Sequence, residues 1–247
     1  MASARMDLRP ALPTVLVLAG GLGTRLRPLT HDLPKVLVPV LGRPFIDHLL
    51  QDLIRQGATR FLISVGYRAE QVEQHLGDGS RLGCQVTYVQ EDTPLGTGGA
   101  ILHALPRMAE ESFVVVNGDT LLEVDLSGLV QHHLHAGTLA TLAAVRVPDR
   151  GRYGALQVEA GRVVAFEEKR PGAGAGLING GVCVLRRQLL DDAPAAPFSL
   201  ERDLLPRHLG RIAVFETDGF FVDMGTHEAL QDLDRSLARY FAGQRRT

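Results

Sequence analysis

The chain has 247 residues and a formal net charge of −2, and 45% of its residues are hydrophobic. This composition supports a folded core, while the near-neutral charge excludes a general affinity for nucleic acid or for anionic membranes. No apolar run approaches the ~20 residues that a membrane-spanning helix requires, and two cysteines in so long a chain favour a reducing compartment. We therefore expect a cytoplasmic protein, with residues 1–12 as an N-terminal extension that lacks a signal-peptide pattern.

The first predicted element is a short apolar run over residues 15–19, which indicates a buried parallel strand. Three glycines follow it within four positions: Gly20, Gly21 and Gly23. Their conformational freedom permits a tight turn that points several backbone N–H groups into one concavity, which attracts anions. Arg25 and Lys35 add full positive charges beside these partial ones. The stretch therefore predicts a polyphosphate site.

Two familiar phosphate-binding motifs are excluded at this turn. The dinucleotide-binding fingerprint requires a glycine three residues after Gly23, and the chain has Leu26 there. The Walker A loop requires a Gly-Lys-Ser/Thr triplet, and none follows the glycines. The turn is therefore expected to bind phosphate in another way.

Helices and strands alternate along the rest of the first half. We expect helices over 44–57, 68–76 and 98–105 and strands over 61–65, 85–90 and 113–116. This alternation predicts an α/β fold in which helices cover both faces of a parallel sheet. Ligands of such sheets bind at the carboxyl ends of the strands. The turns at 20–24, 94–99 and 117–119, which follow three of the strands, should therefore converge in space.

The second half is less regular. The pattern predicts a helix over 126–136, a strand over 139–146, a hairpin of 153–158 with 162–168, a flexible Gly/Ala segment over 171–176, a polar turn over 177–181, a helix over 201–205 capped by Ser199, and a last helix ending near 241. No linker divides the chain. We expect one domain, with a nucleotide-binding half over about 13–125 and a half for a second substrate over about 126–247.

Two aspartates follow apolar runs where a carboxylate should lie at the edge of the sheet: Asp119 and Asp223. Such a pair can hold Mg2+, which prefers carboxylate and phosphate oxygens, although either aspartate alone could simply cap a turn. Lys169 precedes the Gly/Ala segment, and a lone lysine there can hold a phosphate monoester as a point charge. It could instead pair with the adjacent Glu167 and Glu168.

The chain closely resembles the sugar-1-phosphate nucleotidyltransferases. The resemblance rests on an ordered series of motifs: L-A-G-G-L-G-T-R-L-R-P-L-T at 18–30 with P-K at 34–35, V-G-Y at 65–67, P-L-G-T-G-G-A at 94–100, N-G-D at 117–119, R-Y-G at 152–154, E-K at 168–169, I-N-G-G at 178–181, F-S-L-E-R-D at 198–203 and F-V-D-M-G-T at 221–226. It implies a three-layer α/β/α fold with a Rossmann-like mixed, mostly parallel sheet. The implied reaction is in-line attack of a sugar 1-phosphate on the α-phosphorus of an NTP, with release of pyrophosphate.

The resemblance also assigns roles to residues. It implies catalytic roles for Arg25, Lys35 and Asp119, and Mg2+ binding by Asp119 with Asp223. The implied nucleotide-binding residues are Leu18, Ala19, Gly20, Gly21, Gly23, Thr24, Gln90, Gly96 and Thr97. The implied sugar-phosphate-binding residues are Gly154, Glu168, Lys169, Asn179 and Gly180.

Base and sugar are less sharply indicated. Residues 176–182, 198–203 and 65–67 together look most like D-glycero-α-D-manno-heptose 1-phosphate guanylyltransferases, which implies GTP and that heptose phosphate as substrates. Residues 75–83 resemble N-acetylmuramate 1-phosphate uridylyltransferases instead. Mannose-1-phosphate guanylyltransferase, a glucose-1-phosphate uridylyl- or thymidylyltransferase and a non-catalytic, nucleotide-sugar-sensing paralogue stay as alternatives. A metal-dependent glycosyltransferase with similar layers would require an Asp-x-Asp pair. Residues 117–119 offer only one carboxylate, which disfavours that class. The sequence leaves a homo-oligomer open.

Overall fold

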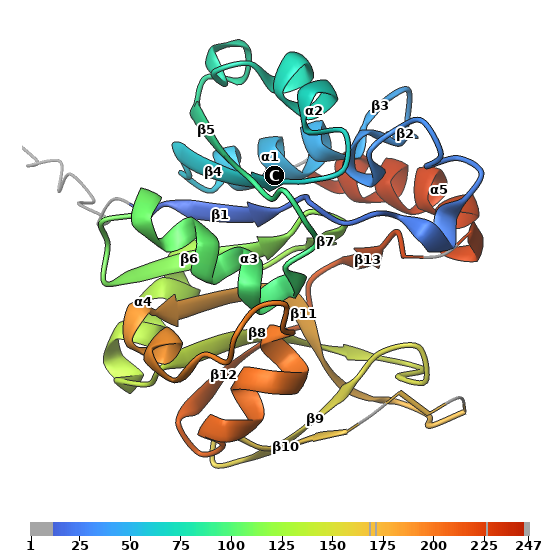
Figure 1. The fold of residues 1–247 in the computed structure, drawn as a ribbon. Helices are drawn as coiled ribbons and strands as arrows, with labels where there is room; N and C mark the ends of the chain where they lie inside the picture. Colours follow the sequence, from blue (N-terminus) through green and yellow to red (C-terminus); the bar gives the residue numbers. More distant parts are fainter. Residues whose placement is uncertain (1–11, 168, 171, 226, 245–247) are drawn as a thin grey trace, which may run out of the picture.

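The computed structural model describes residues 12–167, 169–170, 172–225 and 227–244. One nine-stranded sheet runs through both halves of the chain, in the order β5-β4-β1-β6-β11-β8-β12-β10-β9 (Figure 1). Its strands are β1 (Val15–Leu18), β4 (Arg60–Val65), β5 (Gln85–Gln90), β6 (Ser112–Asn117), β8 (Ala140–Val147), β9 (Ala155–Glu159), β10 (Arg162–Glu167), β11 (Gly176–Arg186) and β12 (Ile212–Thr217). The helices are α1 (Phe45–Arg55), α2 (Ala69–Leu76), α3 (Gly96–Ala104), α4 (Leu126–Ala136) and α5 (His227–Gln244).

Two short ribbons accompany the sheet. The strands β2 (Pro39–Val40) and β3 (Arg43–Pro44) form one of them, and β7 (Thr120–Leu122) pairs with β13 (Phe221–Asp223) in the other. Among the residues that the structure describes, no helix is long and apolar enough to cross a membrane.

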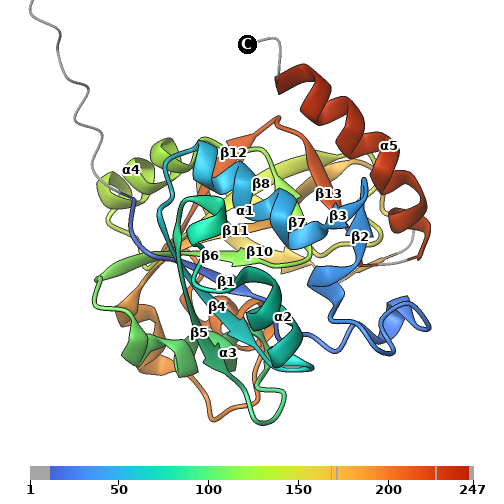
Figure 2. The ribbon, with the colours of Figure 1, turned by 90° about the horizontal axis from the view of Figure 1, so that it is seen from above.

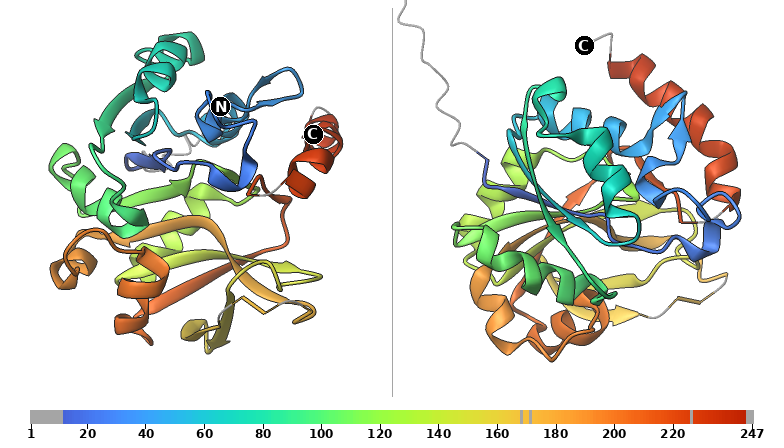
Figure 3. Two further views of the ribbon diagram at one scale, coloured as in Figure 1. Left: turned by 45° about the vertical axis from the view of Figure 1, so that its right-hand side comes forward. Right: turned by 45° about the horizontal axis from the view of Figure 1, so that its top comes forward.

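Helices cover both faces of the sheet, as the two views of Figure 3 show. Successive residues of β1 face opposite sides, so Val15 and Val17 pack into one hydrophobic core and Leu16 into the other. The first core also receives side chains of α1, α2, α4 and α5, whereas α3 contributes to the second. The predicted three layers are confirmed.

Strand direction confirms a mixed, mostly parallel sheet. The strands β5, β4, β1 and β6 are mutually parallel, and β12 is parallel to β8. The strand β11 is antiparallel to β6 and β8, and β10 is antiparallel to β12 and β9. Every strand of this sheet except β11 and β10 therefore runs in the same direction.

The polar turn expected at 177–181 was a wrong prediction. These residues belong to β11, the strand that joins the two halves by pairing with β6 on one side and β8 on the other. The pairing with β8 shifts in register between Asn179 and Cys183, and Gly181 adopts a φ of +78°. This irregularity interrupts the alternation of apolar and polar residues that identifies a strand in a sequence.

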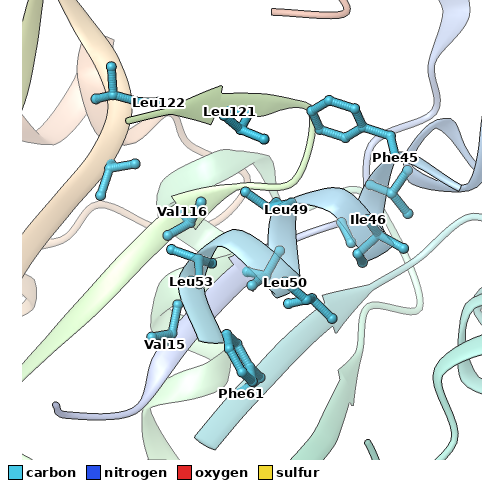
Figure 4. Close-up of a cluster of buried hydrophobic side chains, with 14 of the residues drawn as sticks. Val15, Phe45, Ile46, Leu49, Leu50, Leu53, Phe61, Val116, Leu121 and Leu122 are labelled. Atoms are coloured by element: carbon cyan, nitrogen blue, oxygen red, sulfur yellow. The ribbon is translucent and has the colours of Figure 1, made fainter. Parts of the chain in front are cut away.

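The predicted amphipathic helix after Pro44 is confirmed as α1. Its apolar side chains cover β1, β4 and β6, where Leu50 and Leu53 lie over Val15 and Phe61 (Figure 4). The predicted cap at Ser199 is also present, since its side-chain oxygen accepts a hydrogen bond from the Arg202 backbone N–H.

His133 of α4 is buried, with its ring nitrogens 3.0 Å from the Thr141 hydroxyl and 3.3 Å from the Ser112 hydroxyl. Burial, helped by the positive charge of Arg186, lowers the pKa of His133 from 6.5 to about 4. Below pH 6.5 the unfolded chain binds this proton while the folded protein does not, so the stability of the fold decreases as the pH falls towards 4.

Replacing His133 with glutamine should therefore flatten the acid side of the stability profile. Between pH 6.5 and 5 the wild type should lose about 2 kcal/mol of unfolding free energy that the variant does not lose. Urea unfolding at several pH values measures this difference. The exposed His135, replaced in the same way, is the control and should follow the wild type. Parallel profiles for wild type and His133→Gln would contradict the assignment of a neutral buried ring.

Candidate active site

A cleft of about 420 Å3 lies at the carboxyl ends of β1, β5 and β6. Its walls come from all three turns that were expected to converge, which are far apart in the sequence. The lining residues are Leu18, Ala19, Gly20, Gly21, Leu22, Gly23, Thr24, Lys35, Val36, Glu91, Pro94, Gly96, Thr97, Ala100, Asn117 and Asp119. The structure therefore brings together all of the residues expected to bind nucleotide except Gln90.

The glycine turn has the shape that its sequence requires. Gly23 adopts a φ of +60°, and its carbonyl accepts a hydrogen bond of 2.7 Å from the buried Thr30 hydroxyl. A Cβ on Gly20 would lie 2.7 Å from the Glu91 carboxylate. Neither position admits a side chain without displacement of its neighbours, so the backbone of the turn stays open to the cleft.

Lys35 pairs with Asp119 at the inner end of this cleft. Lys35 begins a single helical turn, and its side chain is only 14% exposed, so this cation is held in place and partly removed from water. A smaller chamber of about 180 Å3 adjoins the cleft and shares Lys35 and Asp119 with it. Arg25 lines this smaller chamber but not the cleft, and its side chain is exposed.

The two expected metal-binding aspartates are neighbours. The ribbon of β7 and β13 pairs Asp223 with Thr120, and the Met224 backbone N–H donates to the Asp119 carbonyl at 3.0 Å. Burial raises the pKa of Asp223, and the negative charge of Asp119 raises it further. Two carboxylates that repel each other at the end of a phosphate-sized cleft suit a divalent cation, which would relieve that repulsion.

The donor set is small. In the part of the chain that the structure describes, no three His, Cys, Asp or Glu side chains gather to hold a metal. Mg2+ does not require such a cage, because it commonly keeps its waters and binds one or two carboxylates together with substrate phosphates. The residues present therefore fit Mg2+ held jointly by protein and nucleotide.

A second pocket, of about 710 Å3, lies between the β9–β10 hairpin and residues 170, 172 and 173. It is lined by Arg150, Tyr153, Ala155, Glu167, Lys169, Arg170, Gly172 and Ala173. Arg150 donates to Glu167 at 2.7 Å, while Lys169 is exposed. Three cations and one carboxylate give this pocket a positive surplus, as a phosphate monoester requires. Glu168 lies outside the described residues.

Tyr153 lines this pocket and also packs against β13, the strand that carries Asp223. Its ring meets Phe221 of β13 edge-on, at 5.5 Å between ring centroids. Burial raises the pKa of Tyr153, and the nearby charge of Asp223 adds to that shift. The second pocket therefore lies beside the strand that carries Asp223.

The remaining sugar-phosphate candidates are placed differently. Gly154 is exposed next to Tyr153. Asn179 is half-buried on β11, and its side-chain oxygen accepts from the Gly181 backbone N–H at 3.2 Å. Gly180 is buried, and a Cβ there would lie 2.5 Å from the Leu122 side chain of β7. This glycine therefore permits close packing of β11 on the ribbon of β7 and β13.

Gln90 and Glu91 reverse the expected assignment. The Gln90 side chain is exposed and does not line the cleft, and its backbone carbonyl faces His103. Glu91, which the sequence interpretation passed over, lines the cleft and accepts hydrogen bonds from the Ser64 hydroxyl at 2.9 Å and the Leu95 backbone N–H at 3.1 Å. The available signal was its position as the first residue beyond a strand.

Comparison with known proteins agrees with this geometry. The chain is 34% identical over 228 residues to D-glycero-alpha-D-manno-heptose 1-phosphate guanylyltransferase of Aneurinibacillus thermoaerophilus. The matched region covers 91% of this chain and 98% of that protein. It is 38% identical over 233 residues to mannose-1-phosphate guanylyltransferase of Mycobacterium tuberculosis, covering 90% of this chain but only 65% of that longer protein. The crystal structure of HddC from Yersinia pseudotuberculosis complexed with GMP-PN matches with a TM-score of 0.82 and 33% identity, over 92% of this chain and 100% of that one. The model of the nucleotidyl transferase family matches residues 14–239, and the chain belongs to this family.

Proposed function

We propose that this protein is a sugar-1-phosphate guanylyltransferase that joins GTP to a sugar 1-phosphate and releases pyrophosphate. The observation that carries the proposal is the meeting of Lys35, Asp119 and Asp223 beside the glycine-lined cleft. Tyr153 of the second, basic pocket packs against Phe221, two residues before Asp223. D-glycero-α-D-manno-heptose 1-phosphate is the proposed sugar phosphate, supported by heptose 1-phosphate guanylyltransferases that match over nearly their whole length. Mannose 1-phosphate is the second candidate, supported by the mannose-1-phosphate guanylyltransferase relative, of which this chain covers 65%.

The two cavities divide the substrates between them. In this proposal the nucleoside lies in the larger part of the cleft, between the 20–24 and 94–99 turns, and the outer phosphates enter the chamber lined by Arg25. The sugar phosphate lies in the second pocket, which Lys169 lines. Gly154 follows the lining residue Tyr153, and Asn179 and Gly180 would support the sugar phosphate from β11. A role for Glu168 stays a proposal from the sequence. We propose a single domain on the same grounds, because one sheet carries both cavities.

The chemistry needs no general base. A phosphate monoester has a second pKa near ~6, so the sugar phosphate is largely dianionic at neutral pH and can attack the α-phosphorus directly. The obstacle is the repulsion between two anions. Lys35 and Arg25 reduce it with fixed positive charge, and positioning together with electrostatics carries such a transfer. Mg2+ bound at Asp119 and Asp223 would neutralise further phosphate charge and align the reacting groups.

The Glu91 carboxylate suits guanine better than uracil or thymine. A carboxylate offers acceptors only, and each of its oxygens retains lone-pair capacity beyond the bonds from Ser64 and Leu95. The Watson–Crick edge of guanine presents two adjacent donors, N1–H and the N2 amine, that match such a group. Uracil and thymine present a single donor between two carbonyl oxygens, which a carboxylate repels. This complementarity supports GTP as the nucleotide.

Replacing Glu91 with glutamine should relax base choice. We expect the ratio of kcat/KM for GTP to that for UTP to fall about tenfold to a hundredfold, because the amide repels the pyrimidine carbonyls less and pairs with guanine less well. Steady-state pyrophosphate release with each NTP measures this ratio. The exposed Asp92 lies one residue further along, and Asp92→Asn is the matched control. An unchanged ratio in Glu91→Gln would remove this residue from base recognition.

Lys169→Ala should weaken sugar-phosphate saturation selectively. We expect KM for the sugar 1-phosphate to rise about tenfold or more while KM for GTP changes little, because the lost charge lies in the second pocket. The chain contains only two lysines, Lys35 and Lys169. An amine-directed reagent read by mass spectrometry can therefore follow each one, with the sugar phosphate protecting Lys169. Selective loss of GTP saturation would contradict this role.

A matrix of NTPs against sugar 1-phosphates, read by pyrophosphate release, tests the proposed function as a whole. We expect the highest kcat/KM for GTP with the heptose or mannose phosphate. Turnover confined to UTP or dTTP with a glucose or N-acetylmuramate phosphate would favour the other family activities. Nucleotide binding without turnover for any pair would indicate a sensing paralogue. A cytoplasmic location and a homo-oligomer stay predictions.

A further inference from the structure

Residues 198–203, here called the 198–203 segment, come from the second half of the chain but pack against the 94–99 turn of the nucleotide cleft. The Phe198 backbone N–H donates to the Leu95 carbonyl at 2.9 Å. The Phe198 carbonyl accepts from the N–H groups of Gly98 at 3.0 Å and Gly99 at 3.3 Å. These are two of the N–H groups at the start of α3, a kind of helix end that binds phosphate in other proteins, and here the Phe198 carbonyl accepts from both of them.

Side chains strengthen this junction. The Thr97 hydroxyl donates to the Glu201 carboxylate at 3.1 Å and accepts from the Leu200 backbone N–H at 2.9 Å. The Ser199 hydroxyl donates to the same carboxylate oxygen of Glu201 at 3.3 Å. A threonine hydroxyl has one proton to donate, and here Glu201 receives it. Thr97 therefore lines the cleft with its hydrogen directed into the protein.

The glycines of the 94–99 turn also leave room for the 198–203 segment. A Cβ on Gly96 would lie 2.4 Å from the Phe198 carbonyl oxygen, and one on Gly98 would lie 2.1 Å from the Phe198 ring. Phe198 is itself buried. The P-L-G-T-G-G sequence thus permits close contact with the 198–203 segment, in addition to any contact with a ligand.

We propose that Glu201 is a positioning residue of the nucleotide site, and that Thr97 supports nucleotide binding through Glu201 rather than by donating to the nucleotide. The inference rests on the proposed function, because it takes the cleft to be the nucleotide site. The 198–203 segment holds the nucleoside-facing wall at its correct distance from the glycine turn, and Glu201 orders the wall by accepting from both Thr97 and Ser199.

A double-mutant cycle on Thr97 and Glu201 tests this inference. Thr97→Val and Glu201→Ala should each weaken GTP binding about tenfold, the cost of one unmade hydrogen bond in a partly buried site. The double variant should also bind about tenfold more weakly than the wild type, because both changes break the same link. KM for the sugar 1-phosphate and kcat should change much less. Glu216→Ala removes an exposed carboxylate of β12 and is the control.

Calorimetric GTP binding is the primary measurement, with steady-state kinetics beside it. Glu201→Gln keeps an acceptor for the Thr97 hydroxyl and should restore most of the affinity lost in Glu201→Ala, which also covers the case in which the alanine variant folds poorly. A hundredfold loss in the double variant, or an unchanged affinity in Glu201→Ala, would overturn the inference. Wild-type protein that binds GTP but transfers nothing would count against the proposed function while leaving the cycle interpretable.

Discussion

Asp119→Asn and Asp223→Asn should each reduce Mg2+-dependent pyrophosphate release by about a thousandfold, within the range expected when a group that stabilises transition-state charge is lost. Asparagine keeps the size of the side chain and removes its charge, so the effect would report on electrostatics rather than on packing. The effect should be large because the ribbon of β7 and β13 brings these carboxylates together and Asp223 is half-buried.

Metal binding can be measured without turnover. Titration with Mn2+, followed by the electron paramagnetic resonance of the free ion in the presence of GTP, should show weaker binding to both variants. Asp218→Asn, at an exposed position shortly before β13, is the matched control and should behave as the wild type. Full activity with unchanged Mn2+ affinity in either variant would refute the metal assignment for that residue.

The second large effect is expected at the phosphate cations. Lys35→Ala should lower kcat by about a hundredfold to a thousandfold, since Lys35 is the partly buried cation at the junction of the two chambers. Arg25→Lys should raise KM for GTP about tenfold with a smaller change in kcat, because lysine keeps the charge but cannot fork two phosphate oxygens. Steady-state pyrophosphate release separates these kcat and KM effects.

Lys35 pairs with Asp119 in the structure, in addition to its proposed contact with phosphate. Removing Lys35 therefore leaves Asp119 without that cation, and the Lys35→Ala variant should bind Mn2+ at least as tightly as the wild type. This combination separates loss of a phosphate cation from loss of the metal site. Arg239→Lys, at an exposed position of α5, is the control for Arg25. A Lys35→Ala variant with normal kcat would exclude Lys35 from the reaction.

The sequence predicted the first half of the fold well. The strands β1, β4 and β6 are compact apolar runs and α1 has a regular apolar face, so local pattern and final structure agree there. The ribbon of β7 and β13 was not predictable in this way, because β7 is three residues long and pairs with a strand about a hundred residues away. Likewise the bulge in β11 arises from pairing with two neighbours at once, which no local pattern contains.

In the candidate site too, local patterns were predictable from the sequence and contacts between distant residues were not. Asp119 and Asp223 were identifiable because each carboxylate follows an apolar run. The sheet-edge rule holds for Asp119, just beyond β6, whereas Asp223 ends β13 of the small ribbon. The ion pair of Lys35 with Asp119 and the link from Thr97 to Glu201 join residues about 80 and 100 positions apart, so only the fold reveals them. Gln90 was named by resemblance, and the residue after it, Glu91, is the one that lines the cleft beyond the end of β5.

The C-terminal helix shows how distant packing supports the site. The α5 helix runs beside α1 and the β2–β3 ribbon (Figure 2), where the Tyr240 hydroxyl donates to the buried Asp52 at 2.8 Å. The Tyr240 ring stacks on Phe220, at 4.7 Å between ring centroids, just before β13. Because β13 carries Asp223, this packing restrains the segment that bears this proposed metal-binding carboxylate.

The central claim is that this site directs attack at the α-phosphorus of GTP. Phosphorus-31 NMR of wild-type protein with GTP, the heptose or mannose 1-phosphate and Mg2+ tests it most directly, because each phosphorus gives its own signal. The predicted result is equal growth of pyrophosphate and of a nucleoside diphosphate-sugar as GTP and sugar phosphate decline. Release of orthophosphate, or no consumption of GTP while it is bound, would contradict the claim.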